Sequence, residues 1–89
     1  MKRTRKLTVH LGADNVTGTV DYPAVAGFVA GNWEGATIIP GWGVYKGKVE
    51  QSAMMVVYTD ANDDEMDAFC EGLRKRFDQE AVYSVVEEI

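Results

Sequence analysis

The segment 53–58 constrains the fold most, because all six of its residues are apolar. The alternation of a strand would place Ala53, Met55 and Val57 on one face of a sheet, and Met54, Val56 and Tyr58 on the other. A strand that is apolar on both faces is normally covered on both faces. The sequence therefore predicts a strand over 48–59 with a covering layer on each side.

Three further segments have the character of strands. Residues 5–11 alternate between apolar and polar side chains, which is typical of a half-buried strand. A β-branched run opens a strand over 36–45, and a turn at Lys46-Gly47 would join it to the strand over 48–59. Pro40 and two nearby glycines predict a bulge or an edge position there. Residues 81–86 form the last predicted strand.

The segment 61–77 has the clearest helical pattern in the chain. Asn62 and Glu65 match a capping box, and Asp60 is an alternative cap. Acidic residues crowd the first turn and basic residues the last. Five side chains recur at the spacing of one helical face: Met66, Phe69, Cys70, Leu73 and Phe77. We expect this face to pack on the sheet.

A second helix is predicted over 21–32. Asp21 can cap it, and Pro23 falls in the first turn, where its missing N–H costs nothing. Gly27 and Gly31 lie four residues apart on one face, so we expect them to allow close packing against a sheet.

The order of these elements defines the expected fold class. Strand, helix, strand, strand, helix, strand is the order of the α+β ferredoxin-like plan, β-α-β-β-α-β. That plan predicts a four-stranded antiparallel sheet with two helices on one face. The face without helices would carry apolar side chains, so we expect a homodimer or homotrimer formed through it.

Composition bounds the setting of the protein. The 89 residues fit one domain over 1–89, with a basic and flexible arm at 1–5. The net charge of −5 argues against a general nucleic-acid binder. A single cysteine excludes an internal disulfide and favours a reducing compartment. We therefore expect a cytoplasmic protein, of a bacterium or of a host cell if viral, without a signal peptide or membrane association.

Several kinds of chemistry find no support in the sequence. His10 is the only histidine and Cys70 the only cysteine, so no zinc-type cluster can form. His10 is expected on a sheet face, and Cys70 in the core. No phosphate-binding glycine motif occurs, because Gly41-Trp42-Gly43 precedes a strand rather than a helix. We expect no metal, no cofactor and no assigned catalytic residue.

The most unusual stretch spans 33–50, where aromatic residues alternate with glycines and lysines follow. Aromatic faces stack on bases, and lysines meet phosphates. Equally, the glycines could shape a hairpin while the aromatic side chains cap a small core. On the binding interpretation, the ligand-binding candidates are Trp33, Trp42, Tyr45, Lys46, Lys48, Glu50 and Gln79.

The stretch 36–82 carries a resemblance to known proteins. It holds residues 36–38, 41–47 and 50–52, then an apolar strand and a helix initiated at Asp60, and closes with residues 77–82. It resembles small uncharacterised bacterial and phage ferredoxin-like proteins and, more distantly, the PII and CutA-like group. That resemblance implies a trimer with inward-facing sheets and ligand clefts between subunits. It also implies that the loop between the second and third strands is a recognition element. The phosphate-binding residues of PII have no counterpart here.

Three functions remain open at this point. The sequence favours a non-enzymatic oligomeric binding protein, sequestering or sensing a small ligand such as a nucleotide, in the manner of a phage accessory protein. The alternative is a protein–protein inhibitor or adaptor that binds a host protein through an acidic surface. The third is a small enzyme that uses Glu50 or Asp14.

Overall fold

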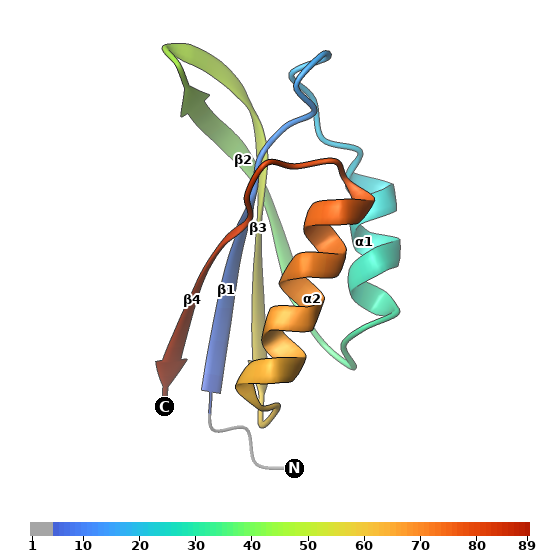
Figure 1. The fold of residues 1–89 in the computed structure, drawn as a ribbon, viewed down its shortest axis with the longest axis vertical. Coiled ribbons are helices and arrows are strands. Elements are labelled where there is room, and N and C mark those ends of the chain that lie inside the picture. The colour runs from blue at the N-terminus through green and yellow to red at the C-terminus, as the bar shows by residue number, and fades with distance from the viewer. Residues whose placement is uncertain (1–4) are drawn as a thin grey trace.

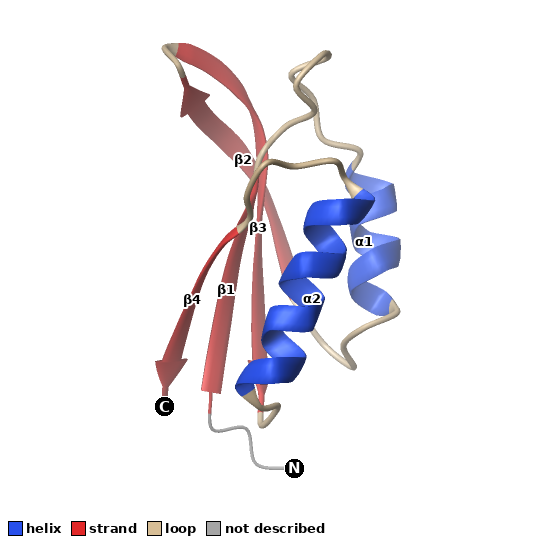
Figure 2. Ribbon diagram, viewed as in Figure 1, coloured by secondary structure: helices blue, strands red, loops and turns tan. Residues whose placement is uncertain are grey.

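A computed structural model describes residues 5–89 of the chain. The elements are β1 (Arg5–Leu11), α1 (Tyr22–Ala30), β2 (Thr37–Tyr45), β3 (Lys48–Thr59), α2 (Asp63–Arg76) and β4 (Tyr83–Glu88). The strands form one sheet in the order β2-β3-β1-β4, and each neighbouring pair is antiparallel. Both helices lie on the same face of the sheet (Figures 1 and 2). The ferredoxin-like prediction is confirmed.

The core lies between the helices and one face of the sheet. Leu7, Val9 and Leu11 of β1 alternate inward, as do Ala53, Met55 and Val57 of β3. The registers Leu7↔Val57, Val9↔Met55 and Leu11↔Ala53 bring these rows together. From the helices, the core receives Val25, Val29, Met66, Phe69 and Leu73. The expected packing of the α2 stripe on the sheet is therefore confirmed.

Helix α2 begins with the predicted capping box. The Asn62 side chain accepts from the backbone N–H of Glu65, and the Glu65 carboxylate accepts from the backbone N–H of Asn62. Three acidic residues in the first turn and three basic residues in the last complement the helix dipole. The helix starts at Asp63 rather than at 61, because Asn62 is the cap itself.

Helix α1 is shorter than predicted, and one expectation about it is wrong. Asp21 caps it by accepting from the backbone N–H of Ala24, and Gly31 ends it. A side chain added at Gly27 would meet no atom within 4 Å, so this glycine faces open space and not the sheet. Close packing does not explain Gly27.

Strand β2 is at the edge of the sheet, which accommodates Pro40. Its residues pair one for one with β3, from Thr37↔Val56 to Tyr45↔Lys48, without a bulge. Lys46 and Gly47 have φ values of 49° and 76°, as the two central residues of a tight hairpin turn require. The β2–β3 hairpin extends beyond the helices, at the end of the molecule opposite the described termini (Figure 1).

The face of the sheet without helices, here called the open face, has no covering from residues 5–89. Strand register assigns Met54, Val56 and Tyr58 of β3 to this face, with Tyr83 and Val85 of β4. Tyr58 and Val85 are 52% and 53% exposed. The second covering layer expected for 53–58 is therefore not supplied by the described chain.

The basic arm expected at 1–5 lies outside the described residues except for Arg5. Arg5 is the first residue of β1, and its guanidinium forms ion pairs with Asp63 at 2.7 Å and Glu88 at 3.0 Å. It thus joins β1 to the start of α2 and the end of β4. Within residues 5–89, no helix has the length and apolar character needed to span a membrane.

Candidate ligand-binding cleft

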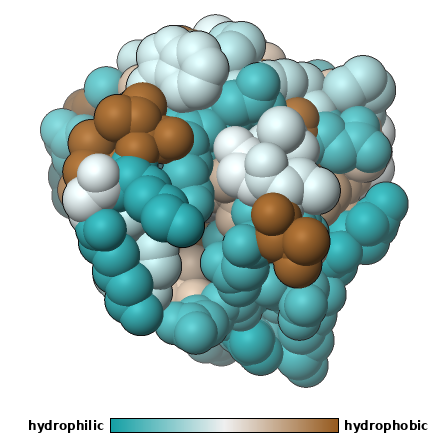
Figure 3. Space-filling view, turned by 90° about the horizontal axis from the view of Figure 1, so that it is seen from above, coloured by the Kyte–Doolittle hydropathy of each residue, from teal (hydrophilic) through white to brown (hydrophobic). Residues whose placement is uncertain are grey.

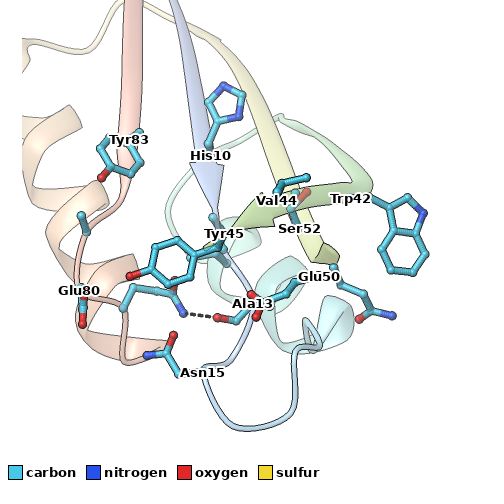
Figure 4. A pocket seen from close by; sticks show the side chains of 16 residues that line it. His10, Ala13, Asn15, Trp42, Val44, Tyr45, Glu50, Ser52, Glu80 and Tyr83 are labelled. Carbon is cyan, nitrogen blue, oxygen red and sulfur yellow. Dashed lines mark hydrogen bonds between the residues drawn. The ribbon is translucent and has the colours of Figure 1, made fainter. Parts of the chain in front are cut away.

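A cleft of about 410 Å³ lies at the hairpin end of the sheet (Figure 4). Its walls come from the end of β1 and the loop after it, the β2–β3 hairpin, and the connection between α2 and β4. The volume falls within the range of small-molecule sites. Seen from this end, the molecule presents separate apolar side chains among hydrophilic ones (Figure 3). Three segments that are distant in sequence therefore meet around one hollow.

Aromatic side chains line the cleft from both edges of the sheet. Tyr45 comes from β2 and Tyr83 from β4, while Trp42 lies toward the outer side of the hairpin (Figure 4). The Tyr45 ring extends toward the α2–β4 connection. Trp42 is 73% exposed and Tyr83 72%. Exposed rings beside a hollow offer apolar faces to a ligand.

Glu50 is the carboxylate of β3 in this cleft. It is half-buried and forms no ion pair with any residue of 5–89. The residue opposite Glu50 on β2 is Gly43, and the residue opposite Ser52 is Gly41. These glycines carry no side chains over β3, and Glu50 and Ser52 both line the cleft. Glu50 can therefore meet a cationic group of a ligand.

Asp14 has a different place, in the turn that follows β1. Its Oδ1 accepts from the backbone N–H groups of Val16 and Thr17, at 2.8 and 3.0 Å. These bonds lower the pKa of Asp14 below its ordinary value, the Thr17 bond most. Its neighbours Ala13 and Asn15 line the cleft, whereas Asp14 does not. Asp14 shapes the loop that forms one wall.

Gln79 attaches the α2–β4 connection to the loop after β1. Its side-chain Nε2 donates to the carbonyl oxygen of Ala13 at 3.1 Å and to that of Phe77 at 3.2 Å. The Arg74 guanidinium, ion-paired with Glu71, donates to the carbonyl oxygen of Gln79 at 3.3 Å. Asp78, with a φ of 52°, turns the chain just before Gln79. Strand β4 begins after these contacts, at Tyr83, which is two residues later than predicted.

Gln51 holds the same loop from the other side. Its Oε1 accepts from the backbone N–H of Val20 at 2.9 Å, and its own backbone N–H donates to Gly18. The Tyr22 hydroxyl donates to the carbonyl oxygen of Ser52. The loop between β1 and α1 is therefore fixed between the hairpin and the α2–β4 connection.

The sequence candidates divide between three places. Trp42, Tyr45, Glu50 and Gln79 line the cleft. Lys46 and Lys48 are exposed at the hairpin turn, with the Lys46 ammonium 5.3 Å from the centre of the Tyr45 ring. Trp33 lines a separate cavity of about 260 Å³ that also includes Thr59 and Glu65. Its ring packs edge-on against Phe69, and its buried Nε1 has no acceptor within residues 5–89.

Sequence reasoning did not select several residues that line the cleft. His10 and Tyr83 are direct partners across β1 and β4 on the open face. Both are exposed and both line the cleft, as do Asn15, Ser52 and Glu80. The alternation of the two strands places His10 and Tyr83 on one face, but their pairing depends on a register that the sequence does not specify.

Metal binding and thiol chemistry find no support among residues 5–89. No group of three His, Cys, Asp or Glu side chains is arranged to hold a metal ion there. Cys70 is half-buried, and burial raises the pKa of its thiol. A raised pKa disfavours the thiolate form that a nucleophile requires.

The fold is similar to solved structures of two kinds. A phage SAM lyase in complex with S-methyl-5'-thioadenosine matches with a TM-score of 0.75 and 19% identity, over 99% of this chain and 83% of that chain. The apo state of a phage SAM lyase matches with a TM-score of 0.68 and 21% identity, over 99% and 86%. CutA from Synechococcus elongatus, complexed with Bis-Tris, matches at 0.58 and 17%, over 99% and 82%. No family model and no curated protein sequence matches.

These comparisons confirm the resemblance to phage and CutA-like proteins and correct the functional expectation. The interpretation as a non-enzymatic binding protein is wrong, because the two lyase structures, matched over 99% of the chain, are enzymes. The inclination against an enzyme is wrong for the same reason. Of the three functions left open by the sequence, the enzymatic one agrees with the comparisons.

Proposed function

We propose that this protein is an enzyme that cleaves S-adenosylmethionine in the cleft at the hairpin end of the sheet. The observation that carries the proposal is the cleft itself, with aromatic rings and an unpaired carboxylate around one hollow. The similarity to a phage SAM lyase bound to S-methyl-5'-thioadenosine supports this substrate class. The cleft also favours an enzyme over the inhibitor alternative, because an inhibitor that binds through an acidic surface needs no such hollow.

The identity of that bound molecule indicates which bond such a reaction breaks. S-methyl-5'-thioadenosine keeps the methyl and adenosyl groups on sulfur, so the bond from sulfur to the methionine γ-carbon is the one cleaved. The carboxylate of the substrate can attack that carbon, forming a C–O bond as the C–S electron pair returns to sulfur. The products are homoserine lactone and the neutral thioether. The sulfonium and carboxylate charges cancel, and neither water nor a proton is consumed.

The residues of the cleft suit a reaction in which charge disappears. Opposite charges combine more readily where water is excluded, because a low dielectric destabilises separated charges. Tyr45 and Tyr83 supply aromatic walls, and a ring face also attracts a sulfonium cation. We assign to Glu50 the binding of the substrate's ammonium group, which orients the substrate carboxylate toward the γ-carbon.

The test is to incubate the purified protein with S-adenosylmethionine and follow both products by liquid chromatography and NMR. We expect equimolar S-methyl-5'-thioadenosine and homoserine lactone. Glu50→Gln should lower kcat/KM by about tenfold or more, as expected when a charge-assisted contact is lost. Asp67→Asn, an exposed carboxylate on α2 outside the cleft, is the matched control. Folded protein that forms no thioether product would refute the proposal.

We also propose that the protein self-associates through the open face and acts in the cytoplasm. The open face carries exposed Ile39, Tyr58, Tyr83 and Val85. A soluble monomer seldom leaves such a surface uncovered. Tyr83 belongs both to this face and to the cleft, so a second copy on the open face would help to enclose the ligand.

A further inference from the structure

The side-chain amide of Gln79 has a fixed orientation. A carboxamide has two N–H donors and one oxygen acceptor. Both donors are used, because Nε2 bonds to the carbonyl oxygens of Ala13 and Phe77. If the amide were turned over, its oxygen would face these two carbonyl oxygens and repel them. Gln79 can therefore present only an acceptor, Oε1, to any further group.

This acceptor lies beside Gly12 at the wall of the cleft. A side-chain carbon added to Gly12 would lie 3.1 Å from Oε1, so the absence of a side chain at Gly12 leaves room next to the oxygen. Gly12 and Gln79 both line the cleft. Within residues 5–89, the Gln79 side chain has no hydrogen bonds except the two that its nitrogen donates.

Contacts with helix α2 also hold Gln79 in position. The Arg74 guanidinium donates to the backbone carbonyl of Gln79, and the Arg74–Glu71 ion pair fixes that guanidinium. Gln51, the other glutamine of the cleft, differs in one respect: its Oε1 already accepts from the Val20 N–H. Gln79 is thus a preorganised acceptor without a donor, whereas Gln51 is satisfied within the chain.

We propose that Gln79 determines specificity in the cleft by accepting a hydrogen bond from an N–H or O–H group of the nucleoside. The inference rests on the proposed function and names one of its contacts. On an adenosine-type ligand, the donor is the exocyclic amine of the base or a ribose hydroxyl. A site built around a fixed acceptor rejects an analogue without the donor, because the oxygen then loses water without gaining a partner.

The experiment measures binding to the purified protein by calorimetry. The probes are S-methyl-5'-thioadenosine, its inosine counterpart, which has a carbonyl in place of the amine, and its 2'-deoxy and 3'-deoxy forms. We expect one of these analogues to bind about tenfold more weakly, or worse, and thereby to identify the donor. Gln79→Leu should bind that analogue and the parent compound equally.

Two further variants separate recognition from support of the loop. Gly12→Ala should weaken the discrimination, because the new methyl group crowds Oε1 but leaves the amide's own donors in place. Gln51→Leu removes the corresponding loop contact on the other side, yet should keep the wild-type ratio of affinities. A change in loop support alone would alter all affinities together and leave their ratio unchanged.

Equal affinities for all four compounds in the wild type would overturn the role of Gln79 and leave the lyase proposal standing. If Gln79→Leu still binds the parent compound more tightly than the weak analogue, by the wild-type ratio, the role of Gln79 is likewise overturned and the lyase proposal stands. Folded protein that binds none of the four compounds would overturn the proposed function, and the role of Gln79 with it.

Discussion

The two carboxylates that the sequence offered for catalysis lie in opposite environments. Glu50 lines the cleft opposite Gly43 and has no ionic partner within residues 5–89. Asp14 is engaged by backbone N–H groups of its own turn. A carboxylate that already accepts such bonds is a poor proton acceptor, because its ionised form is stabilised. Residue type alone does not separate these two roles; hydrogen bonding does.

The lowered pKa of Asp14 predicts a pH dependence of stability. The ionised carboxylate stabilises the folded turn, and this contribution is fully present above the ordinary Asp pKa of 3.8. It is lost as the pH falls through the lower pKa of the folded state. Asp14→Ala should therefore be destabilising at pH 7, by an amount that shrinks below pH 4.

Urea denaturation of the wild type and Asp14→Ala, from pH 7 to about pH 2, measures this difference. Asp14→Asn is the control, since it keeps an oxygen acceptor that does not titrate. A difference between wild type and Asp14→Ala that stays constant over the whole range would contradict the account.

At the scale of elements, α2 should carry much of the stability. Leu73 is fully buried between the helices and the sheet. Leu73→Ala should lower the free energy of unfolding by about 2–5 kcal/mol, from lost burial and the cavity left behind. Cys70→Ala, one position along the same stripe and only half-buried, should cost less. Chemical denaturation measures both, and a loss below about 1 kcal/mol for Leu73→Ala would show that the stripe does not support the core.

Most of the fold could be predicted because its signals are local. Strands 5–11 and 48–59 match their predicted bounds, since alternation and the Lys46-Gly47 turn specify them. The capping box likewise locates α2. The start of β4 could not be predicted, because Gln79 bonds to Ala13, 66 residues away in sequence.

The cleft was only partly predictable, for the same reason. Its aromatic and acidic hairpin residues stand out in the sequence. His10 and Tyr83 do not, because they become neighbours only through the pairing of β1 with β4. Trp33 stood out equally, but a ring contact with Phe69 places it beside the core rather than in the cleft. An unusual residue type in the sequence therefore does not show whether the side chain lines the cleft or packs beside the core.

At the scale of the whole molecule, the open face bears on the oligomeric state. Its apolar side chains are uncovered in the described chain, and closed association of identical copies would cover them. We predict that light scattering at micromolar concentration gives a mass two or three times that of the 9.8 kDa chain.

Val85→Asp should shift that mass toward the monomer, because it places a charge in the proposed interface. Val16→Asp is the control: Val16 is 93% exposed, and it lies in the loop after β1 rather than on the sheet. A wild-type mass that stays at the monomer value over a wide concentration range would contradict association through this face.

NMR can test whether the cleft at the hairpin end binds the nucleoside of S-adenosylmethionine. S-methyl-5'-thioadenosine is titrated into uniformly ¹⁵N-labelled protein, and the backbone amide signals are followed. We predict saturable shifts at residues 12, 13 and 15, at residues 43–45 and 50–52, and at residues 79–81, all of which line the cleft. Shifts confined to the Trp33 cavity, or no shifts at millimolar ligand, would contradict this prediction.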